Sequence, residues 1–343
     1  MFKREQQRYF FINKDVKNST LLLPELLDLV YANTFSTLKP GRVRYGVMLR
    51  EDGHVMDDGT TARLSDDHFV MTTTTAAAGE VMRHLEFVHQ CLRPDLDVAF
   101  VSVTEQWAQF AIAGPKSRDL LNDLLDDPLE DGDWPFMACG PVSVMGAAAR
   151  LFRISFSGEH AYELAVPARY GESLFKLLLE RAEELGGGPY GMEALNVLRI
   201  EKGLLTHAEL HGRTTAFDLG MEKMVSARKD CIGKTMSERP GLTDPARERL
   251  VGLKPVERIN ALTAGAHLFN RGAEPVRTND QGYVTSVCHS PTLGHSIALG
   301  FLKNGPERIG EKVRFVDHLR GTDFECDVVS PVFFDPDGGR ARG

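Results

Sequence analysis

Cysteine is scarce in this sequence, and its five cysteines lie far apart. Their number is odd and no two form a C-x-x-C pair, so neither a disulfide framework nor a zinc site is indicated. Long apolar runs are also missing: no stretch reaches about 18 apolar residues, and the run at 9–12 is too short for a signal peptide. We therefore expect a cytoplasmic protein that does not interact with membranes.

A surplus of positive charge is lacking as well. Lys and Arg number 40 against 48 Asp and Glu, which gives a formal charge of −8. Such a chain has no general electrostatic field for nucleic acid or for an anionic membrane. With 42% hydrophobic and 26% charged residues, the composition is that of a globular protein. The length of 343 residues suits two domains, because single cores stop growing near ~250–300 residues.

Helix and strand patterns alternate through the first two thirds of the chain. A leucine-rich segment predicts a helix over 21–31, and two strands at 43–49 and 55–64 flank an Asp-Gly turn and form a hairpin. A strand at 69–75 precedes a helix at 80–88. Further strands are expected at 98–104, 109–113, 142–145, 149–155 and 162–166, and further helices at 116–125, 171–185 and 192–202.

The last hundred residues have a different pattern. A polar segment with Pro and Gly at 237–245 is the best linker candidate, so we place a domain boundary there. No convincing helix follows, and short β-rich runs predict a small barrel or sandwich. These runs are at 250–253, 267–268, 282–286, 296–301, 312–315 and 325–329.

Asp57 and Asp58 lie in the strand after the Asp-Gly turn. Neighbouring side chains of a strand point to opposite faces, so one carboxylate can face a cavity while the other faces solvent or a backbone donor. A carboxylate in a cleft could anchor an amine, stabilise a developing cation or act as a base. For an isolated pair, however, a solvated turn with a capping aspartate is the simpler interpretation.

Glu163 alternates with Ala161 and Ala165 along a predicted strand. An acid between small residues leaves room for a flat ligand, such as a pterin, whose adjacent N–H groups could donate to both carboxylate oxygens. An acid on an edge strand that faces water is an equally good interpretation.

Two other motifs are less informative. The glycine-rich segment at 186–191 follows a helix and has no phosphate-loop spacing, and no dinucleotide fingerprint occurs elsewhere, so we expect no FAD or NAD site in this chain. His207 and His211 flank Glu209 but lack the H-E-x-x-H order. They predict a polar loop or helix face, with a metal site as the weaker alternative.

Several motifs, taken together and in order, resemble those of the folate-dependent aminomethyltransferases, whose best-known member is the T-protein of the glycine cleavage system. The family signatures Y-x-x-M and G-x-x-x-D-D have counterparts at 45–48 and 53–58. The other matching segments are G-P-K at 114–116, F-S-G-E-H-A-Y-E-L at 156–164, T-S at 285–286 and S-P-T-L-G at 290–294.

Within this family, the chain is most similar to the C-terminal, tetrahydrofolate-binding portion of the sarcosine oxidase alpha subunit. It departs from the T-protein pattern at Leu195, where T-proteins have a folate-site arginine, at Phe156, which replaces a tyrosine, and at 207–213, which replaces a G-Q-D segment. These departures argue against a lipoyl carrier protein as a partner. The segments that carry the similarity are 43–53, 71–75, 102–108 and 197–203.

The resemblance implies an α+β fold with subdomains around a central folate cavity and a C-terminal β-barrel. It also implies a reaction in which tetrahydrofolate captures the one-carbon unit of an iminium, formed from a sarcosine-type N-methyl amine by flavin-bearing subunits, and glycine is released. Asp58 corresponds to the family's catalytic aspartate and Glu163 to its pterin-binding glutamate. Tyr45 matches a residue that lines the pocket, Thr74 stands where T-proteins have an asparagine near the folate, and Phe156 stands at the position of their tyrosine; all three are expected at the cofactor site.

The resemblance leaves two alternative functions open, and it also suggests how the chain is divided into domains. A T-protein or folate-dependent demethylase that acts alone is one alternative. The other is a non-enzymatic folate-binding factor of iron–sulfur cluster assembly, although its motif cysteine is missing from 202–209. Residues 1–20 lack the family's D-x-S pattern and form an atypical extension. Residues 21–240 would then be the folate-binding domain and 246–343 the barrel domain.

Overall fold

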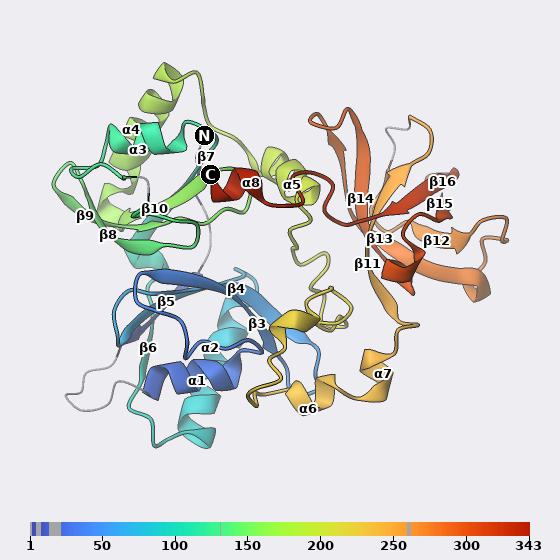
Figure 1. The fold of residues 1–343 in the computed structure, drawn as a ribbon, viewed down its shortest axis with the longest axis horizontal. Helices are drawn as coiled ribbons and strands as arrows, with labels where there is room; N and C mark the ends of the chain where they lie inside the picture. Colours follow the sequence, from blue (N-terminus) through green and yellow to red (C-terminus); the bar gives the residue numbers. More distant parts are fainter. Residues whose placement is uncertain (1, 5–7, 14–21, 131, 259–261) are drawn as a thin grey trace.

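The computed structural model describes residues 2–4, 8–13, 22–130, 132–258 and 262–343. Their helices and strands form three units, two five-stranded sheets with helices and one closed barrel. Figure 1 shows the three units around a common centre, with helix α5 (Met192–Glu201) between the second sheet and the barrel. The expected mixture of helices and strands with a C-terminal barrel is confirmed.

The first sheet has the strand order β3-β4-β5-β2-β6, and its strands pair in antiparallel fashion. Two helices, α1 (Leu22–Val30) and α2 (Ala78–Phe87), pack their apolar sides on one face of this sheet. The leucines that predicted α1 lie in this core. The strands are β2 (Arg8–Asn13), β3 (Arg42–Leu49), β4 (Val55–Arg63), β5 (His68–Thr73) and β6 (Ala99–Ser102).

The second sheet has the order β1-β7-β10-β9-β8. Leucines of α3 (Ser117–Asn122) and α4 (Gly171–Glu184) pack on one of its faces. The glycine-rich segment at 186–191 follows the end of α4, as its pattern predicted. The strands are β1 (Phe2–Arg4), β7 (Trp107–Ala113), β8 (Cys139–Val144), β9 (Ala147–Phe152) and β10 (Ala161–Pro167).

The barrel closes in the order β11-β14-β13-β12-β15-β16 around a core of aliphatic and aromatic side chains. Two short helices, α6 (Lys234–Ser237) and α7 (Pro240–Thr243), occupy the segment before it. Its strands are β11 (Glu248–Pro255), β12 (His267–Asn270), β13 (Asp280–Ser290), β14 (His295–Lys303), β15 (Lys312–Asp317) and β16 (Thr322–Val329).

The C-terminal segment contains a short helix, α8 (Gly339–Arg342), although the sequence predicted no helix beyond residue 246. One turn is too short to give a helical hydrophobic period, so the pattern could not reveal it. The segment returns to the second sheet, where the buried Arg153 guanidinium donates a 2.9 Å hydrogen bond to the carbonyl oxygen of Ala341. On its way there the segment passes the end of α5, where the backbone N–H groups of Phe333 and Phe334 donate to the carbonyl oxygen of Glu201 (Figure 1).

The N-terminal region contributes two strands that the sequence analysis did not predict. β1 pairs with β7, and β2 lies between β5 and β6, so both depend on partners far along the chain. Most of the remaining positions of the expected extension, 5–7 and 14–20, lie outside the described residues. Among the described helices, none has the length and apolar character needed to cross a bilayer.

Two apolar clusters join the units and frame the space between them. The inter-sheet cluster contains buried side chains from both sheets, among them Val43 and Ala62 of the first sheet and Phe152 and Ala165 of the second. The junction cluster joins the first sheet to the end of α5, the loop that follows it and the barrel. Its members include Val47, Leu49, Val55, Ile200, Leu210, Leu299 and Phe301.

Candidate functional site

The hairpin of β3 and β4 carries the two adjacent aspartates. Asp58 lies opposite Val47 and Asp57 lies opposite Met48, so the two carboxylates leave the sheet on opposite faces. Met48 packs in the core under the helices, whereas Val47 belongs to the junction cluster. Asp57 is therefore on the helix-covered face, and Asp58 is on the face that looks toward the other two units.

Asp58 is paired with Tyr45. The tyrosine hydroxyl donates a 2.5 Å hydrogen bond to Oδ2 of the carboxylate, which is half-buried. Burial raises the pKa of Asp58, while the Tyr45 hydrogen bond and the nearby His207 act in the opposite direction. Burial and the neighbouring carboxylate raise the pKa of Tyr45, so the phenol keeps its proton and remains the donor. Tyr45 thus fixes one oxygen of Asp58.

Asp57 has a backbone partner instead. Its side chain is 2% exposed, and Oδ2 accepts a 3.0 Å hydrogen bond from the backbone N–H of Thr74. Burial, with a smaller contribution from Asp58, raises the pKa of Asp57 to about 7, although the hydrogen bonds of Thr74 oppose this rise. Thr74, which was expected at the cofactor site, is thus hydrogen-bonded to Asp57 and not to Asp58.

Glu163 lies in the middle of the second sheet, because β10 is flanked by β7 and β9. Its side chain is buried, which excludes the alternative of an edge-strand acid that faces water. The side-chain amide of Gln109, which is also buried, donates to Oε2 of Glu163. Gln109 was not singled out from the sequence. Gln109 lies on the neighbouring strand β7, opposite Ala165, so it is on the same face of the sheet as Glu163. Its position in a predicted strand was the feature of the sequence that could have identified it.

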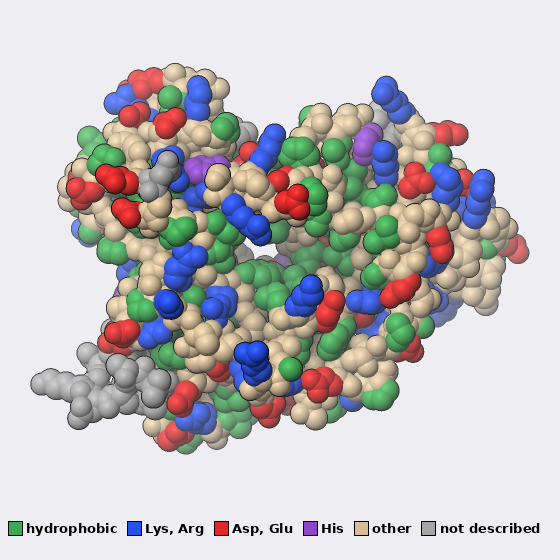
Figure 2. All heavy atoms as spheres, viewed as in Figure 1, with side chains coloured by type: hydrophobic (Ala, Val, Ile, Leu, Met, Phe, Trp, Pro, Cys, Tyr) green, Lys and Arg blue, Asp and Glu red, His purple; other side chains and the backbone are tan. Residues whose placement is uncertain are grey.

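Asp58 and Glu163 face the same region between the sheets. Ala62 lies on the same face of β4 as Asp58, and Ala165 on the same face of β10 as Glu163. Both alanines pack in the inter-sheet cluster. The two carboxylates therefore stand on the facing surfaces of two sheets, and Figure 2 shows that the molecule is hollowed at its centre, where the three units meet.

An aromatic and basic pair borders this inter-sheet region. The Arg150 guanidinium lies 3.8 Å from the ring centroid of Trp107, and burial lowers its pKa to about 10. Both side chains, together with Gln109, line a small cavity between the sheets. The sequence alone does not reveal this pair, because the stacking depends on two strands that are not adjacent in the sheet.

The two positions that depart from the T-protein pattern lie in different surroundings. Phe156 is half-buried in the bend between β9 and β10, a few residues before Glu163. Leu195 is 3% exposed on α5 and belongs to the apolar interior. Leu195 therefore has a packing role in this chain.

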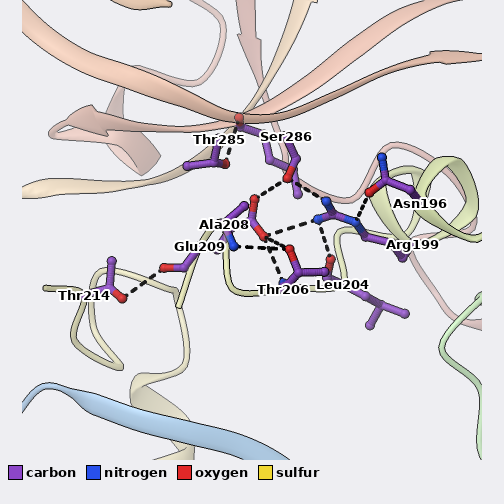
Figure 3. A network of polar contacts seen from close by, with 10 residues as sticks. Asn196, Arg199, Leu204, Thr206, Ala208, Glu209, Thr214, Thr285 and Ser286 are labelled. Carbon is purple, nitrogen blue, oxygen red and sulfur yellow. Dashed lines mark hydrogen bonds and ion pairs between the residues drawn. The ribbon is translucent and has the colours of Figure 1, made fainter. Parts of the chain in front are cut away.

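The loop after α5 contains a buried acid, although its sequence predicts a polar segment. Glu209 is 0% exposed, and its Oε2 lies 3.2 Å from Nη1 of Arg199, which is also buried. Oε1 accepts a 2.6 Å hydrogen bond from the hydroxyl of Ser286 on β13. Figure 3 shows Glu209 at the centre of this network, between the barrel strands and α5. The feature of the sequence that could have indicated its burial is that the acid lies between the apolar Leu205 and Leu210.

Neither histidine of this loop belongs to a metal site in the described part of the chain, where no group of three or more His, Cys, Asp or Glu side chains could hold a metal ion. His207 is exposed, and Nε2 of His211 lies 2.6 Å from the hydroxyl of Tyr283.

Two family models match this chain in succession. The GCVT N-terminal domain matches residues 24–229, and the Glycine cleavage T-protein C-terminal barrel domain matches residues 248–335. The chain therefore belongs to the glycine cleavage T-protein family, a family of enzymes, as its motifs indicated.

Individual proteins that are similar to this chain include sarcosine oxidase alpha subunits and aminomethyltransferases. The chain is 51% identical over 319 residues to Sarcosine oxidase subunit alpha of Rhizobium meliloti (strain 1021), which is 92% of this chain but 32% of that protein. It therefore spans about a third of the length of such subunits. It is 30% identical to the Aminomethyltransferase of Streptomyces coelicolor, over 90% of this chain and 81% of that protein.

A solved structure agrees with the fold. The crystal structure of glycine cleavage system aminomethyltransferase T from Bartonella henselae superimposes with a TM-score of 0.80 at 22% identity. The match covers 96% of this chain and 84% of that one. It supports the arrangement of two sheets and a barrel described above.

Proposed function

We propose that this chain catalyses a tetrahydrofolate-dependent one-carbon transfer, in which the methylene group of an oxidised N-methyl amine becomes 5,10-methylenetetrahydrofolate and an amine such as glycine is released. The observation that carries the proposal is the position of the half-buried Asp58. Tyr45 holds its carboxylate on the surface of the first sheet that faces the Glu163 side of the second sheet. A cationic substrate and a flat, N–H-bearing cofactor would find complementary groups on the two facing sheets.

The reaction balances without an oxidant. Bound tetrahydrofolate would supply N5 and N10, which take the methylene carbon and give up their two protons, while the C–N bond to the amine breaks and the amine leaves with both protons. Asp58 is the group that would move protons in this exchange. Its negative charge would also stabilise the iminium cation before the transfer.

The burial of Asp58 suits this role. Desolvation raises its pKa, so the carboxylate takes up a proton more readily than an exposed aspartate does. The Tyr45 hydroxyl donates a hydrogen bond to Oδ2 of Asp58 and so fixes the orientation of the carboxylate. A fixed carboxylate can approach the reacting nitrogen without the loss of side-chain freedom that a mobile one would incur.

Glu163 and Gln109 would hold the cofactor. A buried carboxylate between small residues can accept two adjacent N–H groups of a pterin edge, the geometry that carboxylates also use with guanidinium groups. Gln109 fixes the orientation of Glu163 from the neighbouring strand. We also assign Thr74 and Phe156 to the cofactor site, because they stand at positions where T-proteins have an asparagine and a tyrosine.

The oxidation step would take place elsewhere. The similarity to Sarcosine oxidase subunit alpha supports a division in which flavin-bearing subunits or segments produce the iminium and this chain consumes it. Residues 21–240 would form the folate-binding domain and 246–343 the barrel domain, with a cytoplasmic location. In the alternative of an aminomethyltransferase that acts alone, the one-carbon donor would be an aminomethylated lipoyl carrier protein instead.

Calorimetry with tetrahydrofolate tests the proposal. The wild-type chain should bind, and Glu163→Gln should bind at least about tenfold more weakly, since a hydrogen bond to a buried charge is worth roughly 1.5–3 kcal/mol. Glu172→Gln, which removes the same charge from the exposed surface of α4, is the matched control and should bind like wild type. A folded wild-type chain without detectable binding would refute the proposal. A chain purified with bound flavin would contradict the proposed division of labour.

A further inference from the structure

The loop that replaces the family's G-Q-D segment has a fully buried anchor in the carboxylate of Glu209, in addition to the contact of His211 with Tyr283. Oε2 of Glu209 accepts hydrogen bonds from the backbone N–H and the hydroxyl of Thr206, at 2.9 and 3.1 Å, and faces Nη1 of Arg199. Oε1 accepts from Ser286 of the barrel. Four donors thus converge on one fully buried carboxylate, an arrangement that an amide, with a single acceptor oxygen, cannot satisfy.

The same residue is linked to the strand that carries Asp58. The hydroxyl of Thr214 donates a 3.0 Å hydrogen bond to the backbone carbonyl of Glu209. The carbonyl of Thr214 in turn accepts a 2.9 Å hydrogen bond from the backbone N–H of Val55, the first residue of β4. Asp58 follows three residues later. Figure 3 shows Thr214 on the far side of Glu209 from the barrel.

The titratable groups near Asp58 come from β3, β4, the residue after α1 and the loop after α5. Tyr45 reaches it from β3, Asp57 precedes it on β4, and Tyr31 of the α1 side is close enough to interact electrostatically with both carboxylates. The exposed His207 belongs to the loop fixed by Glu209 and lowers the pKa of Asp58. Of these groups, only His207 lies on the loop itself.

We propose that Glu209 is a positioning residue for Asp58. It anchors the 206–214 loop to Arg199 and Ser286, and thereby holds both the start of β4 and His207 in place relative to the Asp58 carboxylate. This inference rests on the function proposed above, because its importance depends on Asp58 taking part in the transfer. Glu209 itself contacts neither substrate nor cofactor in this account.

The chain offers a matched control in Glu201, a second buried acid that binds hydroxyl groups of the barrel side. Its two carboxylate oxygens accept from Ser290 at 2.5 Å and from Thr292 at 3.2 Å. It lies on α5 and has no hydrogen bond to the loop at 206–214 or to β4 among the described contacts. Glu201→Gln should therefore weaken the contact with the barrel without displacing Asp58.

The test compares the pH profiles of one-carbon transfer for wild type, Glu209→Gln and Glu201→Gln. In Glu209→Gln the loop loses its buried anchor and His207 no longer opposes the effect of burial on the pKa of Asp58. The acid limb of the profile should therefore move to higher pH. The maximal rate should fall about tenfold, while the affinity for tetrahydrofolate stays at the wild-type value. Glu201→Gln should keep the wild-type profile even if it lowers stability.

A second variant guards against loss of folding. Thr214→Val removes only the hydroxyl that bonds to the Glu209 carbonyl and keeps the backbone bond to Val55, so it should fold and shift the profile in the same direction, by less. If wild type is active but Glu209→Gln and Thr214→Val keep its profile, the positioning role is refuted. If wild type transfers no one-carbon unit, the proposed function fails instead. The Asp58 pKa, measured by NMR, should still rise in Glu209→Gln, and an unchanged value would refute the positioning role independently of activity.

Discussion

Replacing Asp57 by Asn should make the protein more resistant to unfolding at neutral pH. The Asp57 side chain is 2% exposed, and its pKa is raised from the ordinary 3.8 to about 7, chiefly by burial. A carboxyl group whose folded pKa lies above the unfolded value stabilises the folded state below the unfolded pKa, and this stabilisation is lost as the pH rises through the folded pKa. The loss therefore falls between about pH 4 and pH 7 and is at most on the order of 4 kcal/mol.

Urea unfolding of wild type and Asp57→Asn across this range measures the effect. The two proteins should be similar near pH 4, because a protonated aspartate and an asparagine are isosteric, and the variant should become progressively more stable toward pH 7 and above. Asp317→Asn is a control of opposite sign, because Thr263 and Arg320 lower the pKa of Asp317 to about 2. That variant should lose stability at neutral pH. A difference between Asp57→Asn and wild type that does not change with pH would refute the reasoning.

Two further experiments test the packing around the site. Glu209→Leu leaves the buried Arg199 without its ion-pair partner and should lower the free energy of unfolding by about 3–5 kcal/mol. The double variant with Arg199→Met should cost less than the sum of the two single variants, as urea unfolding of all four proteins would show. Additive costs would contradict the coupling. Gly59→Ala places a Cβ 2.0 Å from the carbonyl oxygen of Thr72, so it should separate β4 from β5 and lower the melting temperature. An unchanged melting temperature would contradict this close approach.

The sequence predicted most strands and helices near their observed positions, because alternation and β-branched residues report which side of a strand is buried. The alternation also predicted correctly that Asp57 and Asp58 point to opposite faces, and the backbone donor that the pattern allowed for is the N–H of Thr74. β1 and β2 were not predicted, because they are held by strands more than fifty residues away rather than by a local turn.

Pairing between distant residues was the main information that the sequence lacked. Gln109 contacts Glu163 across two strands, and Glu209 contacts Ser286 from a loop 77 residues earlier. A single sequence shows each of these residues as a polar side chain in a polar or mixed segment. Only the fold shows that they are buried and that each fixes the position of another group.

The most direct test of the account is the rate at which 5,10-methylenetetrahydrofolate forms from tetrahydrofolate and the iminium of glycine and formaldehyde. Asp58→Asn should lower this rate about a hundredfold or more, the usual contribution of a general acid or base, while it still binds tetrahydrofolate. Tyr45→Phe, which removes the hydrogen bond to Oδ2, should reduce the rate less. A rate equal to that of wild type in Asp58→Asn would contradict the central claim that this carboxylate carries the transfer.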